Sequence, residues 1–184
     1  RKQSSFAALA IRVMTEMRDN GTVAFIGPDD TCSAEALVAA AWNLPMISYK
    51  CADKLVSDKR VYYTFARTLP PSTKVSKSVV ALLQAFDWNK FVIVAKKSPA
   101  WAVQIKDAIK DLAIDNNLNV IESIEFGNNY YMSLPEDIKE LEHIVRETFR
   151  KARVYVFVGE HIALVDFVRV LQGLRLLERG EYIV

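Results

Sequence analysis

The sequence lacks most of the signals that identify an enzyme site. Among 184 residues there are only two histidines, two cysteines and six glycines. Gly27 has no further glycines at the spacing of a dinucleotide-binding loop, and no Gly-x-Ser-x-Gly nucleophile turn occurs. Two histidines and a pair of bridged cysteines are too few for a zinc site of usual spacing. We therefore expect no catalytic residue, no metal and no cofactor in this segment.

Two further classes are excluded by what is missing. The formal net charge is +2 and Lys and Arg are scattered without a basic block, so we expect no nucleic-acid partner. No apolar run approaches the ~20 residues that a membrane span needs.

The chain opens without Met, inside a predicted helix, and its last four residues resemble the start of a strand. We expect both ends to be truncations of a longer chain.

The residues that are present suffice for a large core, because 51% are hydrophobic and 25% are charged. Apolar strands alternate with amphipathic helices from end to end, which predicts an α/β fold with doubly wound parallel sheets rather than a barrel. The expected strands are residues 23–26, 45–50, 61–67, 91–95, 118–124 and 154–158, with a last strand beginning at Tyr182. The expected helices are residues 4–18, 32–42, 72–86, 98–112, 133–149 and 160–171.

The double proline at Pro70-Pro71 divides these elements into two sets. We expect two partial α/β lobes, residues 1–70 and residues 71–184. The strand at 23–26 is apolar on both faces, as central parallel strands are. We expect the helix at 32–42 to bury Ala36, Leu37, Ala40 and Ala41. The helix at 72–86 should bury Val75, Val79, Leu82, Leu83 and Phe86, and Ser133 and Glu136 match a capping box.

Cys32 and Cys51 bracket one helix and the strand that follows it. The helix advances about 15 Å over ten residues at ~1.5 Å each, and the strand returns about the same distance at ~3.3 Å per residue. The two cysteines should therefore meet where the strands end. We favour a disulfide over two buried free thiols, because both cysteines lie at polar ends of elements. A disulfide implies an oxidising compartment.

The carboxyl ends of parallel strands form the edge at which open α/β sheets bind ligands. The helix that follows Thr31 directs backbone N–H groups at this edge, which suits an anion or a carboxylate. Two such edges facing one another form the cleft of a hinge-closing binding protein. The candidate ligand residues are Gly27, Pro28, Asp29, Asp30, Thr31, Ser33, Ser48, Tyr49, Lys97, Ser98, Tyr130, Glu160 and His161.

Several of these candidates also have a plainer interpretation as turn or cap residues. Asp29 and Asp30 resemble an acid pair, but sequence neighbours rarely face one substrate atom together. His161 follows a strand on the ligand edge, and a helix-start position explains it equally well. Asn20-Gly21-Thr22 is a glycosylation sequon, and Asn-Gly is also a common turn. We expect Asn20 as a glycosylation site.

Several stretches resemble one known family. Gly27-Pro28, Cys32, Glu35-Ala36, Val38-Ala39, the block Trp42-Asn43-Leu44-Pro45-Met46-Ile47-Ser48 and Cys51 are similar to the extracellular ligand-binding region of receptor guanylate cyclases. Residues 63–68, 86–90 and 180–182 continue the resemblance. The likeness is greatest to invertebrate, insect-type members. The wider group is the type I periplasmic-binding-protein-like superfamily.

The resemblance implies a bilobed, extracellular receptor domain that is often a homodimer. In the full protein, a single plasma-membrane span, a kinase-like domain and a cyclase domain that converts GTP into cyclic GMP would follow. The implied partner is an extracellular ligand, and we expect a peptide. The natriuretic-peptide branch binds chloride at a Gly-Pro-x-Cys turn. Here the turn from Gly27 to Cys32 is two residues longer, and Asp29 and Asp30 would repel an anion.

Three hypotheses are open from the sequence. The first is a receptor ectodomain whose ligand controls a distant cyclase. The second is a secreted or lumenal solute-binding protein of the same fold without catalytic activity. The third is a cytosolic α/β enzyme with an unrecognised site, which free thiols would favour. The sequence that follows the domain in the gene separates the first hypothesis from the second, and the motif block favours the first.

Overall fold

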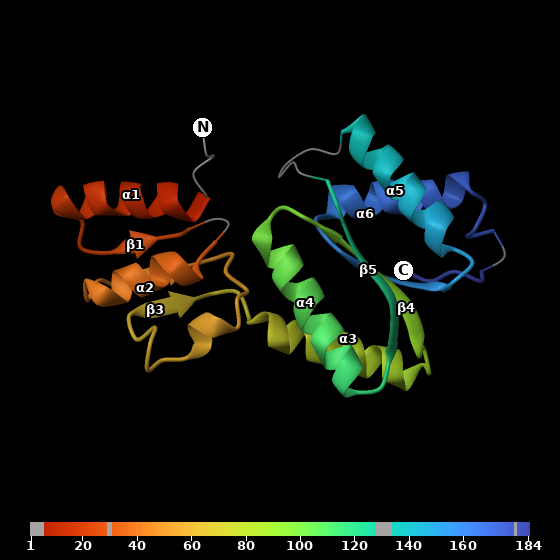
Figure 1. Ribbon diagram of the computed structural model, residues 1–184, viewed down its shortest axis with the longest axis horizontal. Helices are drawn as coiled ribbons and strands as arrows, with labels where there is room; N and C mark the ends of the chain where they lie inside the picture. Colours follow the sequence, from red (N-terminus) through yellow and green to blue (C-terminus); the bar gives the residue numbers. More distant parts are fainter. Residues whose placement is uncertain (1–5, 29–30, 128–133, 179) are drawn as a thin grey trace. The chain divides into compact units, whose positions relative to one another are not determined.

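The protein is α/β throughout the part of the chain that its computed structural model describes, namely residues 6–28, 31–127, 134–178 and 180–184. The chain divides into two compact units, residues 1–72 and residues 73–184 (Figure 1). Each unit has its own sheet of three parallel strands. The predicted α/β class with parallel sheets is therefore confirmed, and each unit is described by itself below.

Unit 1, residues 1–72, has a small sheet in the strand order β1-β2-β3. Its elements are α1 (Phe6–Asp19), β1 (Phe25–Ile26), α2 (Ser33–Ala41), β2 (Met46–Ser48), the short 3-10 helix η1 (Leu55–Ser57) and β3 (Phe65–Arg67). Phe25, Met46 and Phe65 lie side by side in the register of the three strands. All three are buried with Ala36 and Ala39 of α2, and this cluster is the core of the unit.

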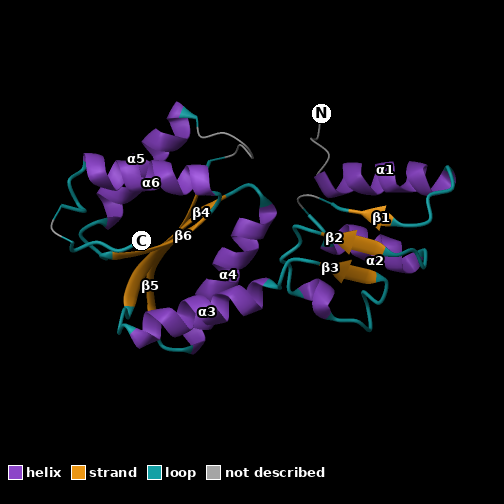
Figure 2. Cartoon of the chain, turned by 180° about the vertical axis from the view of Figure 1, so that it is seen from behind, coloured by secondary structure: helices purple, strands orange, loops and turns teal. Residues whose placement is uncertain are grey.

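The opposite face of the unit-1 sheet is open. Ile26 is 84% exposed and Ile47 is 48% exposed. Figure 2 shows β2 and β3 in front of α2, with no helix of this unit drawn over them. The prediction that residues 23–26 are buried on both faces is wrong, because the described helices of this unit pack on one face only.

Helix α2 buries a different face from the one predicted. Ala36 and Ala40 are buried as expected, but Leu37 is 49% exposed and Ala41 is also exposed, while Ala39 is buried. In a run of alanines the apolar periodicity is weak, so the sequence does not fix which face meets the sheet. The predicted strand at 61–67 is also shorter than expected, because residues 58–62 form turns in which the Tyr62 N–H donates to the Asp58 carbonyl.

Unit 2, residues 73–184, has a larger sheet in the strand order β5-β4-β6. Its elements are α3 (Ser72–Ala85), β4 (Lys90–Lys96), α4 (Ala100–Asp115), β5 (Asn119–Phe126), α5 (Pro135–Thr148), β6 (Val154–Val158) and α6 (His161–Gly173). Helices α3 and α4 cover one face of this sheet, and α5 and α6 cover the other. Unit 2 is therefore doubly wound, as predicted.

The central strand β4 is buried on both faces. Phe91 and Ile93 pack with α3 and α4, whereas Val92 and Val94 pack with α5 and α6. Side chains on both faces of β4 pack against helices. The sequence of β4 is therefore a continuous apolar run, as is usual for parallel strands covered on both faces.

The buried face of α3 is rotated from the predicted one. Leu83 is buried as expected and Val80 is buried too, but Leu82 and Phe86 are 52% and 59% exposed.

The start of α5 and the C-terminus add two details to unit 2. Ser133 of the predicted capping box lies outside the described residues. The Leu134 N–H donates to Asp137 Oδ2 at 3.3 Å at the start of α5. Near the C-terminus, Ile183 forms a parallel bridge with Val154.

Candidate functional site

The two cysteines form a disulfide at the carboxyl edge of the unit-1 sheet. The Sγ atoms of Cys32 and Cys51 are 2.05 Å apart and their Cα atoms are 5.9 Å apart. Both side chains are at most 2% exposed. The pairing predicted from the lengths of α2 and β2 is confirmed. The hypothesis of an enzyme with free thiols is disfavoured, because the chain has no free cysteine.

The disulfide borders a turn whose backbone is tied to the end of β2. The Gly27 N–H donates to the Ile47 carbonyl at 2.9 Å, and Gly27 has a φ of +121°, which L side chains rarely adopt. The Ser48 hydroxyl donates to the Pro28 carbonyl at 3.5 Å and accepts from the Cys51 N–H at 3.1 Å. The structure thus brings Gly27, Pro28, Ser48 and Cys51 together.

The other unit-1 candidates differ in exposure. Tyr49 is 48% exposed, whereas Ser48 is fully buried and serves the turn. Thr31 and Ser33 are half-buried beside the start of α2. Asp29 and Asp30 lie outside the described residues. Of this group, Tyr49 is the side chain that the structure presents most openly at the edge.

Glu35 is a feature of this edge that the list of candidates missed. It is fully buried in the first turn of α2, and the Thr31 hydroxyl donates to its Oε1 at 2.5 Å. Among the described residues, its buried Oε2 has no hydrogen-bond partner. The sequence signal was an acidic residue in the first turn of a predicted helix, where the positive end of the helix dipole favours it. A carboxylate here disfavours an anion at this helix terminus, because like charges repel.

At the carboxyl edge of unit 2, the described candidates lie in the two connections that follow β4 and β6. The Lys97 N–H donates to the Phe126 carbonyl at 3.0 Å, and its exposed ammonium lies 4.0 Å from Glu140 Oε1. Glu140 in turn accepts from the Gly127 N–H at 2.9 Å. Ser98 is half-buried, and Tyr130 lies outside the described residues.

The connection after β6 contributes Glu160 and His161. Glu160 is the residue before α6, and His161 is its exposed first residue. The helix-start interpretation of His161 therefore fits its position. Because β4 and β6 are parallel neighbours, this connection lies beside the end of β4.

Lys96 is the second feature that the candidates missed. It ends the central strand β4 and is only 2% exposed, next to the exposed Lys97. No ion pair joins it to a carboxylate of the described residues. A side chain at Gly159 would come within 3.0 Å of Phe157 and 3.6 Å of the Lys96 Cβ, so the chain passes close to this lysine. The sequence signal was a lysine directly after five apolar strand residues.

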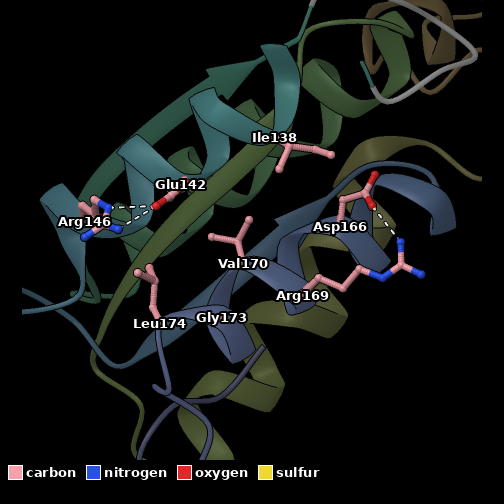
Figure 3. A pocket seen from close by; sticks show the side chains of 8 residues that line it. All are labelled: Ile138, Glu142, Arg146, Asp166, Arg169, Val170, Gly173 and Leu174. Carbon is pink, nitrogen blue, oxygen red and sulfur yellow. Dashed lines mark hydrogen bonds and ion pairs between the residues drawn. The ribbon is translucent and has the colours of Figure 1, made fainter. Parts of the chain in front are cut away.

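A separate hollow of about 350 Å³ lies between α5 and α6 (Figure 3). Its apolar lining comes from Ile138, Val170 and Leu174. Its charged residues are already paired within their own helices, since Arg146 contacts Glu142 at 2.6 Å and Arg169 contacts Asp166 at 3.3 Å. This hollow therefore offers no unpaired charge to a ligand.

The described ranges contain no group of three or more His, Cys, Asp or Glu side chains arranged to hold a metal ion. None of their helices has both the length and the apolar character that crossing a bilayer requires.

Parallel α/β units bind ligands at the carboxyl edge of the sheet, and a disulfide at that edge is typical of a protein from an oxidising compartment. The chain belongs to the family described as the receptor family ligand binding region, or ANF receptor, which matches residues 2–181. The resemblance inferred from the motif block is therefore confirmed.

The similar curated proteins include receptor guanylate cyclases. The chain is 49% identical over its whole length to guanylate cyclase 32E of Drosophila melanogaster and 36% identical over 96% of its length to receptor-type guanylate cyclase Gyc76C of the same organism. It is 27% identical over 96% of its length to the speract receptor of Strongylocentrotus purpuratus. The chain spans only 16%, 12% and 16% of these three relatives.

Proposed function

We propose that this chain is part of the extracellular ligand-binding region of a single-span receptor guanylate cyclase. Ligand binding on this region controls the synthesis of cyclic GMP by a cyclase domain on the other side of the membrane. The observation that carries the proposal is the 49% identity across the whole chain to a guanylate cyclase, together with the family match over residues 2–181. The disulfide supports the extracellular placement, because such bonds persist in oxidising compartments.

The proposed ligand is an extracellular peptide. The speract receptor, a relative of this chain, is named for a ligand of its own. On this chain, Lys96 and Lys97 at the carboxyl edge of unit 2 are the side chains that we assign to ligand contact. Lys96 is buried without an ion pair to any carboxylate of the described residues. Because a buried ammonium needs a counter-charge, Lys96 suits an acidic group of a ligand.

We further propose that the receptor works as a homodimer. Control of a distant cyclase by an extracellular domain requires two arrangements of that domain with different affinity for the ligand. A dimer of receptors supplies such arrangements through its interface. The family resemblance supports this oligomeric state.

The test is to express the full-length receptor in cells and to measure cyclic GMP while synthetic peptides are added outside. We expect receptor-dependent cyclic GMP that at least one peptide raises, and we expect Lys96→Met to weaken that response about tenfold, with Lys110→Met as an exposed lysine control. Absence of receptor-dependent cyclic GMP, including in membranes supplied with Mn²⁺ and GTP, would contradict the cyclase assignment.

The alternative is a secreted or lumenal solute-binding protein of the same fold. It predicts that the complete protein is released into the medium rather than held at the cell surface. It also predicts binding of small solutes without any change in cyclic GMP. Surface labelling of the expressed protein separates the two proposals in the same experiment.

A further inference from the structure

The amino-terminal edge of the unit-2 sheet carries a cluster of basic side chains. A hollow of about 420 Å³ is lined by residues 87–90 and 150–154, which run into the first residues of β4 and β6. These two connections meet because the strands are parallel neighbours, with Phe91 beside Val154. The carboxyl ends of the same strands form the candidate ligand edge, so this hollow lies at the opposite end of the sheet.

The charges around the hollow are strongly unbalanced. Its lining has four cations, Lys90, Arg150, Lys151 and Arg153, and one carboxylate, Asp87. Lys151 is paired with Glu122 at 2.6 Å and Arg153 with Glu181 at 2.9 Å.

Lys90 and Arg150 are exposed and have no ion pair with any carboxylate in the described ranges. The Arg150 guanidinium lies 5.4 Å from the Phe149 ring. Because two of the four cations lack a counter-charge, the hollow offers positive charge to an external anion.

The backbone on both sides of the hollow is fixed. After α5, the Lys151 N–H donates to the Thr148 carbonyl at 2.8 Å in a tight turn. After α3, the chain turns at Asp87, whose φ is +57°, and the Trp88 N–H donates to the Leu83 carbonyl at 2.8 Å. The cations are therefore presented from turns that the core of unit 2 holds in place.

An aromatic surface adjoins the cations. Trp88 lines the hollow, and Phe86, which is 59% exposed, stacks on it with ring centroids 4.9 Å apart. An aromatic face beside arginine and lysine fits a ligand that combines apolar ring faces with fixed anionic groups. Arginine in particular binds such oxyanions with two parallel hydrogen bonds.

We propose that this hollow is a binding site for a sulfated glycan chain. A chain of pyranose rings presents apolar faces to the Phe86–Trp88 pair and sulfate groups to Lys90 and Arg150. Basic patches of this kind attract polyanions, and an extracellular surface meets sulfated polysaccharides rather than nucleic acid. The inference uses the extracellular placement in the proposed function, but it concerns a different edge of the sheet from the peptide ligand.

The test uses the full-length receptor in discs of neutral lipid, immobilised through its intracellular end. We expect saturable binding of a heparin hexasaccharide. The affinity should fall as the salt concentration rises, because the Lys and Arg side chains displace counterions from the polyanion when they bind it. Lys90→Gln/Arg150→Gln should reduce affinity about tenfold or more. The control Lys110→Gln/Lys139→Gln removes the same charge from exposed positions on α4 and α5 and should change affinity less than about twofold.

A charge-preserving pair of substitutions tests whether positive charge at these two positions is what binds the hexasaccharide. Lys90→Arg/Arg150→Lys keeps both charges and should restore most of the binding, even if the neutral pair of substitutions impairs folding. Equal loss in the control variant, equal binding of a fully desulfated hexasaccharide, or no binding by the wild type would each overturn the proposal. Binding to vesicles of anionic lipid without binding to the hexasaccharide would also overturn it. The cyclic GMP assay decides the proposed function separately.

Discussion

Single residues decide the chemistry of the unit-1 edge. The disulfide closes a loop between positions 19 apart in sequence and is part of the unit-1 core. Its pairing could be predicted because helix rise and strand rise are fixed quantities that cancel over this segment. The burial of Glu35 could not be predicted from the sequence. An acidic residue in the first helical turn is ordinarily exposed, and its burial depends on the surrounding packing.

Removal of the disulfide should destabilise unit 1. Cys32→Ser/Cys51→Ser is expected to cost about 3 kcal/mol, because the unfolded chain regains the entropy that the closed loop removes. Thermal unfolding of the receptor ectodomain measures this cost. Reductant should remove most of the difference in unfolding temperature between wild type and the double variant. Equal unfolding temperatures for wild type and variant without reductant would contradict the expectation.

Tyr155 should make unit 2 sensitive to alkali. It is 1% exposed, and burial raises the pKa of its phenol, while the hydrogen bond with Thr148 at 2.9 Å opposes that rise. Nearby Tyr182 and Glu122 add to the increase in pKa. The folded state therefore holds this proton more tightly than the unfolded state, so stability is full below a pH of about 10 and falls as pH rises further.

Tyr155→Phe tests this expectation. The substitution should cost about 1 kcal/mol at neutral pH through the lost hydrogen bond. It should also reduce the loss of stability above a pH of about 10, as measured by unfolding at a series of pH values. An unaltered alkaline loss in Tyr155→Phe would show that another group causes it.

At the scale of elements, α4 is held to β5 by a buried lysine. Lys106 Nζ lies 2.6 Å from Glu125 Oε1 and 2.9 Å from Asp107 Oδ1. Burial lowers the pKa of Lys106, but these two carboxylates outweigh it, so the pKa is raised overall. The lysine thus stays charged, and its stem is buried in the layer between helix and sheet.

Lys106→Met should destabilise unit 2 by about 1–2 kcal/mol, because Glu125 loses a partly buried counter-charge. Lys110→Met on the same helix is exposed and should change stability by less than about 0.5 kcal/mol. Chemical denaturation of the two variants beside wild type measures both values. If the two substitutions cost the same, Lys106 does not anchor the helix.

Element boundaries could be predicted well in unit 2 and less well in unit 1, for one physical reason. Strand β4 meets helices on both faces, so its apolar run at residues 91–95 marks the strand closely. In unit 1, apolar residues such as Ile26 lie on an open face, and only residues 25–26 pair as β1. Hydropathy alone cannot separate a strand covered on both faces from one covered on one face.

At the scale of the whole molecule, the fold class and the family followed from alternating elements and from the motif block between Gly27 and Cys51. The candidate ligand residues followed only in outline, because topology predicts which loops share an edge but not which side chains are presented there. Ser48 illustrates the limit, since it lies at the edge as predicted yet is fully buried in the turn.

The most direct measurement of the central claim is the sequence of the transcript beyond Val184. The account predicts an open reading frame that continues through the ligand-binding region to one apolar span of ~20 residues. Kinase-like and cyclase domains should follow that span. A frame that ends after the binding region without such a span would contradict the receptor assignment and would favour a secreted or lumenal binding protein.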